Sequence, residues 1–567
     1  MSATTTRDGT EETTERTTGG TAGVVADLAR AALADTEVQD LLAAARTRVH
    51  PASPSAEGPE PAAAEAFLRR AARAHRAPGA SPAGAPARLP LPGPDASGAP
   101  GVLDLLAAYA DGSLDPLAVH DAVVAATGPV GPAPTAFTAA VTGSRAAAAE
   151  SARRWATGTA RPLEGVPFAV KEIVDVAGTA VTCGSLHTGE RVAAADATAV
   201  ARLRAAGAVP VAMTATTEFA CGLPTGRRFP AVQNPWEAGR WTGGSSTGSA
   251  AAVAARVVPL ALGTDTGGSV RVPASVCGLT GLKPTRGLVP RTGVATLSWT
   301  LDHVGPLARS AADLAAVLHV LAGPDGTDPA AAEDVPACSP ADVAAHAHLR
   351  GRRLGRVRGW FEQRCDPAVV AAVDAAVDVL RSAGAEVVDV DLPGAGEAYA
   401  DALVVLSCEL LATQEAALPQ LDLFDAGTRK RLARGAAASA ADYLRALRAR
   451  PLAQRQVQAA MDAAGVDALL TPGVGATAPR LEDLSVEVDG RRLPLQEVLP
   501  RNTSPFNLTG SPALVLPAGR GRDGLPVAVQ LVGRPFDDAV LLGLGVAFQR
   551  LTDHHLAAPP TAAPAAR

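Results

Sequence analysis

Short apolar runs alternate with stretches of helical periodicity over most of the chain beyond residue 100. In segment 102–126, for example, apolar residues recur at helical spacing. Continuous apolar runs of the length typical of buried strands occupy 165–170, 208–213, 257–263, 385–392, 467–472, 512–518 and 526–533. Buried strands that alternate with helices predict an α/β fold, in which helices cover both faces of one large sheet.

The first hundred residues follow a different pattern. A polar, threonine-rich start precedes two helical patterns, at 24–49 and 62–76, and a Pro/Gly/Ala-rich stretch then leads into the main domain. Whether the helical extension has a function or is a loosely ordered appendage stays open. The expected organisation is a disordered head at 1–22, a helical extension at 23–76, a linker at 77–101, the main domain at 102–556 and a disordered tail at 557–567.

The composition argues against several classes of function. The 567 residues are 47% hydrophobic and carry a net charge of −6, and no basic run is dense enough to attract nucleic acid or an anionic membrane. The six cysteines show no C-x-x-C spacing, and no histidine pair joins them as a zinc site would need. We therefore expect no nucleic-acid partner, no membrane association, no metal and no cofactor.

The start of the chain also bears on its location. It lacks the basic-then-apolar order of a secretory signal, and no stretch has 18 uninterrupted apolar residues. We therefore expect a cytoplasmic protein with reduced thiols. The oligomeric state is left open, a homodimer included.

Lysine is rare in this chain, so each lysine deserves a test for chemistry that arginine cannot perform. Of the 51 basic residues, only Lys171, Lys283 and Lys430 are lysines, and the other 48 are arginines. An arginine stays protonated at any working pH, whereas a buried lysine can lose its proton and act as a base. Lys171 ends an apolar run, Lys283 precedes a proline and suggests a structural role, and Lys430 lies in a pattern typical of an exposed helix.

One serine-bearing segment has the form of a known nucleophile motif. At 244–248, GSSTG matches the G-x-S-x-G elbow with Ser246 at its centre. An elbow follows a buried strand, however, whereas this segment follows a polar, proline-bearing loop. The hydroxyls and glycines that precede a run of alanines and valines are instead typical of a serine-capped helix start.

A second serine-bearing segment, ALGTDTGGSVRVPA at 261–274, places Ser269 behind two glycines after an apolar run. A helix and a returning strand between Ser245 and Ser269 can bring both hydroxyls, together with Lys171, to one end of a sheet, where the sites of α/β proteins form. The histidine nearest after Ser269 is His303, for which we expect packing or substrate contact at most.

A family resemblance covers roughly residues 100–555. Segment 243–287 reads GGSSTGSAAAVAARVVPLALGTDTGGSVRVPASVCGLTGLKPTRG and resembles the glycine- and serine-rich hallmark of the amidase signature family. Other segments of this chain resemble the flanking segments of that family, in the same order: GVPFAVKEIVDVAGT, TATTEFACG, NPW, TLDHVGPLARS and NTSPFNLTGSPALVLPAG. The resemblance implies a mixed sheet of about eleven strands between helices.

The same resemblance implies a catalytic triad. Ser269 would be the nucleophile, Ser245 the bridging serine behind a cis Gly–Ser peptide, and Lys171 the base. For Lys171 to accept a proton near neutrality, its reference pKa of ~10.4 must fall by several units. Burial beside apolar Val170 and Ile173, together with the positive end of the helix that begins nearby, would lower that pKa.

The resemblance also assigns the loop around Ser269. The family's oxyanion hole maps onto the backbone N–H groups of Thr266, Gly267, Gly268 and Ser269. Asp265, Arg271 and Ser246 are expected to support the loop without touching the substrate, although Asp265 and Arg271 could equally form an ordinary ion pair. This chain departs from many members at Glu172 and Thr247, which puts the choice of substrate in doubt.

These observations predict a serine amidohydrolase that uses a Ser-Ser-Lys triad and an acyl-enzyme to cleave the C–N bond of an amide, or of a carbamate or urea-type small molecule. Linear amides are the expected class. A first alternative is the glutaminase subunit of a tRNA-dependent amidotransferase, against which the long N-terminal extension argues mildly. A second is a non-catalytic scaffold whose helical extension binds a partner, which the intact Lys171, Ser245 and Ser269 make improbable. Neither the acyl group nor the leaving amine can be derived from the sequence.

Overall fold

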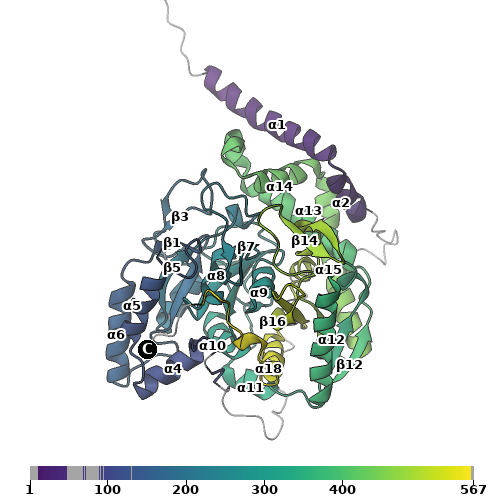
Figure 1. Cartoon of the computed structure of the whole chain (residues 1–567). Helices are drawn as coiled ribbons and strands as arrows, with labels where there is room; N and C mark the ends of the chain where they lie inside the picture. The colour runs from purple at the N-terminus through teal and green to yellow at the C-terminus, as the bar shows by residue number, and fades with distance from the viewer. Residues whose placement is uncertain are drawn as a thin grey trace, which may run out of the picture.

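One large mixed sheet lies at the centre of the part of the chain that the computed structural model describes, namely residues 11–46, 68, 71, 89, 91–93, 95–128, 131–221, 223–336 and 338–562. Within these residues the sheet has eleven strands, and helices lie on both of its sides (Figure 1). The α/β fold and the eleven-stranded mixed sheet are therefore confirmed.

The strand order shows why the sheet is mixed. β2 pairs in parallel with β5 and β8, and β11 pairs in parallel with β12 and β13, whereas the remaining neighbours are antiparallel. Each of the seven apolar runs that predicted a strand overlaps one strand of this sheet. The strands follow the order β1 (Phe137–Ala140), β5 (Val209–Thr214), β2 (Pro167–Lys171), β8 (Leu260–Asp265), β10 (His303–Ala308), β9 (Thr280–Lys283), β16 (Ala513–Arg520), β17 (Pro526–Val532), β13 (Ala468–Pro472), β11 (Arg353–Val357) and β12 (Glu386–Val390).

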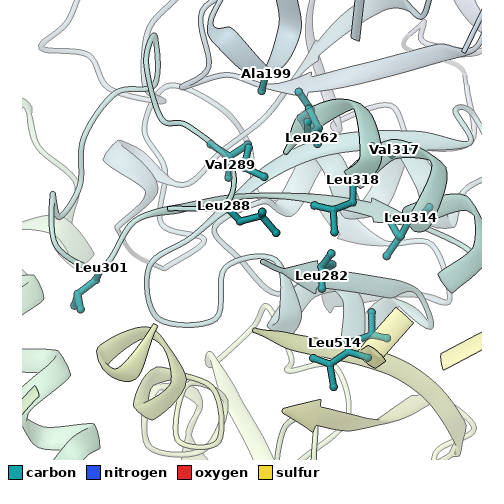
Figure 2. Close-up of a cluster of buried hydrophobic side chains, with 14 of the residues drawn as sticks. Ala199, Leu262, Leu282, Leu288, Val289, Leu301, Leu314, Val317, Leu318 and Leu514 are labelled. Carbon is teal, nitrogen blue, oxygen red and sulfur yellow. The ribbon is translucent and has the colours of Figure 1, made fainter. Parts of the chain in front are cut away.

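Alternation along the strands explains why helices cover both faces of the sheet. In β8, Leu262 joins a buried cluster with Leu314 and Leu318 of α10 (Ala311–Leu321), as Figure 2 shows. Its neighbour Ala261 belongs to a different buried cluster, which contains the alanines of α8 (Thr247–Ala254). Because successive side chains of a strand point to opposite faces, a continuous apolar run such as this one is buried on both sides.

The remaining elements surround the sheet. The helices of the main domain are α4 (Val102–Asp111), α5 (Pro116–Ala126), α6 (Ser144–Ala156), α7 (Thr198–Ala205), α9 (Arg271–Cys277), α11 (Pro340–His346), α12 (Pro367–Ser382), α13 (Ala395–Thr413), α14 (Ala426–Ala437), α15 (Ala440–Ala464), α16 (Leu495–Val498), α17 (Ser504–Thr509) and α18 (Asp538–Gln549), with the 3-10 turns η2 (Glu218–Ala220), η3 (Gly359–Phe361), η4 (Glu415–Leu423) and η5 (His554–Leu556). Among the described residues, three two-stranded sheets pair β3 (Ala180–Val181) with β4 (Arg191–Val192), β6 (Gln233–Asn234) with β7 (Glu237–Trp241), and β14 (Ser485–Val488) with β15 (Arg491–Pro494).

The N-terminal extension forms two helices that lie against the main domain. α1 (Glu11–Leu33) runs beside α14, and α2 (Thr36–Arg46) packs on α13 and α15 (Figure 1). The helix expected at 24–49 is interrupted because Asp35 accepts a hydrogen bond from the Glu37 N–H at 2.9 Å and thereby starts a new helix.

The start of the helical extension differs from the expected organisation, and the segments that follow it can be compared only in part. α1 begins at Glu11, so it includes residues 11–22 of segment 1–22, where we expected no regular structure. Most of the helix expected at 62–76 and much of the linker at 77–101 lie outside the described residues. The division of the chain into these segments therefore stays a prediction.

No single helix among the described residues is both long and apolar enough to cross a membrane. α13 and η4 pass such a test only as a pair, and they are bent by 89° relative to each other. α13 is largely buried within the protein, where it packs against α14, α15 and α17.

Candidate active site

The strand topology brings the predicted site residues to one edge of the sheet. Lys171 is the last residue of β2, and Asp265 is the last residue of β8. Because β2 and β8 are parallel neighbours, their carboxyl ends meet at the same edge, where α/β proteins place their sites. The loop that follows β8 and carries Ser269 therefore starts beside Lys171.

Lys171 is a fully buried amine. Its Nζ lies 2.7 Å from Ser245 Oγ and 2.8 Å from Thr264 Oγ1. Burial lowers the pKa of Lys171 from its ordinary value to about 7, although Asp265 and Asp302 partly oppose that shift. A substantial fraction of the amine is therefore uncharged near neutral pH, as a base requires.

Ser245 and Ser269 line the same pocket, and Lys171 lies behind Ser245. The peptide bond between Gly244 and Ser245 is cis. In the part of the chain that the structure describes, the Ser269 hydroxyl makes no hydrogen bond, and Ser269 is partly exposed to the pocket. The structure thus joins the amine to the Ser245 hydroxyl and leaves the Ser269 hydroxyl open toward a ligand, without a direct hydrogen bond between the two serines.

Ser246 has a different environment from the two serines beside the pocket. It is fully buried, and its Oγ donates to the carbonyl of Thr264 at 3.2 Å and accepts from the Thr264 N–H at 3.3 Å. It stands at the N-cap position of α8, but its side chain makes no capping hydrogen bond. The expected serine cap is therefore wrong, and Ser246 ties the start of α8 to β8. Its buried hydroxyl is also unsuited to the nucleophile-elbow interpretation.

A buried ion pair holds the loop between Asp265 and Arg271. Both side chains are inaccessible to solvent, and Asp265 accepts from Arg271 Nη2 at 2.9 Å and from Arg271 Nε at 3.0 Å. Burial alone would raise the pKa of Asp265, but the adjacent Arg271 guanidinium holds that pKa well below its usual range. Both carboxylate oxygens also accept backbone N–H groups of the loop, from Gly268 and Val270.

Arg271 extends this network to other elements. Its Nη1 donates to Gln530 Oε1 at 2.8 Å and to the carbonyl of Thr503 at 3.0 Å, and its Nη2 donates to Asn507 Oδ1 at 2.6 Å. Asn507 in turn donates to Asp265 Oδ1 at 2.8 Å. The pair is therefore more than an isolated ion pair, since it connects β8 and α9 to α17 and β17. The motif NTSPFNLTG already contained Asn507 and Thr503, but its spacing alone did not reveal this contact.

The backbone N–H groups of the loop differ in what they bind. The Gly268 N–H donates to Asp265 Oδ1 at 2.9 Å. Those of Thr266, Gly267 and Ser269 make no hydrogen bond to any described residue. Of the four predicted oxyanion donors, Gly268 is thus already committed, and three remain available to a ligand.

The walls of the pocket combine apolar and basic side chains. Apolar residues on one side include Leu403 and Leu406 of α13 and Leu499 near α16. Three cations of α14 also line the pocket, and so does one carboxylate from the N-terminal extension: Lys430, Arg431, Arg434 and Glu37. Sequence reasoning missed this charged wall, because it took the helix that carries Lys430 to be an exposed surface helix.

Several other singled-out residues lie outside the pocket. Glu172 is buried and accepts N–H groups of Thr182 and Gly184, so it anchors the turn after β3. Lys283 is fully buried beside the His303 ring at 3.2 Å, and burial lowers the pKa of both groups. Thr247 contacts the hydroxyl of Thr242. These contacts are compatible with a structural role for each residue.

Comparisons with known proteins agree with this geometry. The chain is 38% identical over 476 residues to a glutamyl-tRNA(Gln) amidotransferase subunit of Roseiflexus castenholzii, covering 79% of this chain and 95% of that protein. It is 40% identical over 397 residues to an amidase of Pseudomonas putida, covering 70% and 83% of the two chains.

Solved structures show the same fold. A protein complex linked to the origins of an s-triazine catabolic enzyme matches with a TM-score of 0.75 and 34% identity, covering 79% of this chain and 98% of that one. A peptide amidase from Stenotrophomonas maltophilia matches with a TM-score of 0.66 and 31% identity, covering 79% and 96%.

The name of the Roseiflexus castenholzii relative, glutamyl-tRNA(Gln) amidotransferase subunit, bears on the expected partners. It refers to a tRNA and to one component of a larger assembly, so the expectation of no nucleic-acid partner has no support from the relatives. The family model described as Amidase matches residues 132–542, and the chain therefore belongs to the amidase family, whose members act as hydrolases on carbon–nitrogen bonds.

Proposed function

We propose that this protein is a serine amidohydrolase that cleaves the C–N bond of a small amide through an acyl-enzyme on Ser269. The observation that carries the proposal is the buried Lys171 amine, with a pKa of about 7, at 2.7 Å from Ser245 Oγ. A base with a pKa near the working pH is the most effective proton acceptor. No imidazole is needed in this mechanism, because the Ser245 hydroxyl passes the proton of the attacking Ser269 hydroxyl to the amine.

The first step of the reaction forms a tetrahedral intermediate on Ser269. Neutral Lys171 accepts the proton of Ser245, Ser245 accepts the proton of Ser269, and Ser269 Oγ forms a bond to the carbonyl carbon of the amide. The carbonyl oxygen becomes an oxyanion, to which the free N–H groups of Thr266, Gly267 and Ser269 donate. One such donor is typically worth about a hundredfold in rate or more.

The next steps form the acyl-enzyme and release the two products. The oxyanion collapses and the C–N bond breaks, while the proton held on Lys171 passes through Ser245 to the departing nitrogen, which leaves as ammonia or an amine. Water then attacks the ester carbon and gives its proton to the same relay. The bond to Ser269 Oγ breaks, Ser269 recovers its proton, and a carboxylic acid is released.

The proposed substrate class is a linear amide with an apolar acyl group. The leucines of the pocket wall favour an apolar group, and one similar protein of solved structure is named a peptide amidase. Carbamates and urea-type compounds carry the same carbonyl-to-nitrogen bond and belong in the same screen.

The test is release of ammonia or amine by the purified protein from a panel of amides, carbamates and ureas. We expect turnover in the wild type, loss of at least about a thousandfold in Ser269→Ala, and unchanged turnover in Ser113→Ala, which alters an exposed turn. A fluorophosphonate label should locate to Ser269. A label on Ser246, or full activity in Ser269→Ala, would contradict the proposal.

The second candidate is the glutaminase subunit of an amidotransferase. The similarity to a glutamyl-tRNA(Gln) amidotransferase subunit, which extends over 95% of that protein, favours it. It predicts no turnover by the isolated chain, and hydrolysis of glutamine alone once partner subunits are added. Turnover of simple amides by the chain alone supports the amidohydrolase instead, which also needs no nucleic-acid partner.

A further inference from the structure

The N-terminal extension places a carboxylate in the wall of the candidate active site. Glu37, at the start of α2, lines the same pocket as Ser245 and Ser269. Its carboxylate lies 2.6 Å from Lys430 Nζ and 2.9 Å from Arg434 Nη2, both on α14. Residues almost four hundred positions apart in the chain therefore form one side of the pocket.

The position of α2 does not depend on these ion pairs alone. Val38, Leu42 and Ala45 of α2 are buried in the main hydrophobic core. At the other end of the helix, Arg46 donates through Nε and Nη2 to both carboxylate oxygens of Asp442, at 2.8 Å each. An apolar face and a bidentate ion pair thus hold the helix in place, and Glu37 is presented to the pocket from a fixed element.

The cations that face Glu37 outnumber it. On α14, Arg434 follows Lys430 by four residues and Arg431 by three, so its side chain neighbours each of the other two on the helix surface. Asp35 lies farther from Lys430, at 3.7 Å. Arg431 makes no ion pair with any described residue. Burial and the neighbouring Arg431 lower the pKa of Arg434, which indicates that these positive charges repel one another.

Glu37 also stands between the pocket and an outer groove. Glu37, Tyr399 and Arg434 line both, and the groove continues past Asp40 and Leu41 of α2 toward Trp360. Glu37 and Arg434 therefore lie where the candidate active-site pocket adjoins the surface groove that α2 helps to form.

We propose that the N-terminal extension completes the active-site pocket and that Glu37 determines its charge selectivity. This inference rests on the proposed amidohydrolase function. The Glu37 carboxylate neutralises part of the basic wall and repels a second anion, so the pocket favours uncharged amides over amides that carry a carboxylate. Without the Glu37 carboxylate, Lys430, Arg431 and Arg434 present a more strongly positive site for an anionic group, in which Asp35 remains 3.7 Å from Lys430.

The experiment compares kcat/KM for benzamide and for 4-carbamoylbenzoate, which differ by one carboxylate. In Glu37→Gln, the ratio of the anionic to the neutral substrate should rise roughly fivefold, as expected for a partly exposed charge, and the rise should shrink at high salt. Lys430→Met should shift the ratio the other way. Asp40→Asn removes the same charge from an exposed position of the same helix and should leave the ratio within about twofold.

A binding measurement separates this inference from the proposed reaction. In the Ser269→Ala background, benzoate should raise the melting temperature more when Glu37→Gln is present than when it is absent, whether or not any amide is hydrolysed. Lack of turnover on every amide would refute the proposed function alone. Equal benzoate stabilisation with and without Glu37→Gln, or an equal effect of Asp40→Asn, would overturn the role of Glu37.

Discussion

At the scale of the residue, the proposed chemistry depends on one amine in an unfavourable place. Lys171 is surrounded by protein, and its nearest polar partners are hydroxyls, which stabilise an ammonium ion less than a carboxylate does. Water would solvate the charged form, but the site excludes it, and burial is the largest influence on the pKa of Lys171. The protein thus gives up stability to keep an uncharged base beside Ser245.

Replacing this lysine should reveal that cost. The folded-state pKa of about 7 lies below the ordinary value of 10.5, so between those pH values the unfolded chain binds a proton that the folded chain does not, and the free energy of unfolding rises with pH. Lys171→Met lacks this contribution. In urea unfolding, the free energy of unfolding of the wild type relative to that of Lys171→Met should increase between pH 7 and pH 10, by an amount on the order of 4 kcal/mol. Parallel curves over that range would contradict the depressed pKa.

Gly268 offers a second residue-scale prediction. Its φ of +128° is rarely adopted by residues with a side chain, and a Cβ there would collide with the Thr503 side chain. Gly268→Ala should lower the melting temperature and reduce amide turnover by more than about a hundredfold. Gly267→Ala, at an ordinary φ with one close neighbour at 3.1 Å, should fold with a melting temperature near that of the wild type. Similar melting temperatures for the two variants would refute this interpretation of the loop.

At the scale of the element, β8, α9 and α17 act as one unit around the Asp265–Arg271 pair. Arg271→Met leaves the Asp265 carboxylate buried without its main cation and should cost about 3–5 kcal/mol of stability in chemical denaturation. The double variant Asp265→Asn with Arg271→Met should lose less than the sum of the two single losses, because the charges that remain unpaired in each single variant are both gone. Additive losses would show that the two side chains act independently.

The same elements show what a sequence pattern can and cannot predict. β16 and β17 are long and apolar, so their run of Leu and Val residues identified them directly. The apolar pattern did not predict β9 and β10. TGLK in β9 is short, and HVGPLA in β10 contains glycine, proline and histidine, which weaken a strand pattern. Ser246 illustrates a similar limit in the site, since a serine at an N-cap position can use its hydroxyl for a tertiary contact instead.

At the scale of the whole molecule, the N-terminal helices are part of the body that forms the pocket. Lys171, Ser245 and Ser269 could be singled out because they lie within a recognisable motif order. The contact of Glu37 with Lys430 could not be predicted, because local periodicity identifies the buried face of a helix but not the partner that covers it. The proposal that the N-terminal extension completes the pocket therefore depends on the folded structure and could not be made from the sequence.

Docking of α2 can be tested with two leucines of the extension. Leu42 is 1% exposed, whereas Leu33 is 46% exposed. Leu42→Asp buries a charge in the main hydrophobic cluster and should release α2 from the domain. Hydrogen exchange would show this release as a faster rate for the α2 amides. Leu33→Asp should leave those rates close to the wild-type values. Equal exchange in the two variants would mean that α2 is not anchored by its apolar face.

The pH dependence of kcat/KM for a neutral amide tests the proposed lysine base without any substitution. An uncharged Lys171 as the base predicts a rate that rises with pH and levels off above an apparent pKa of about 7. A rate that keeps rising toward the ordinary lysine value of 10.5, or one that does not change between pH 5 and pH 9, would contradict it.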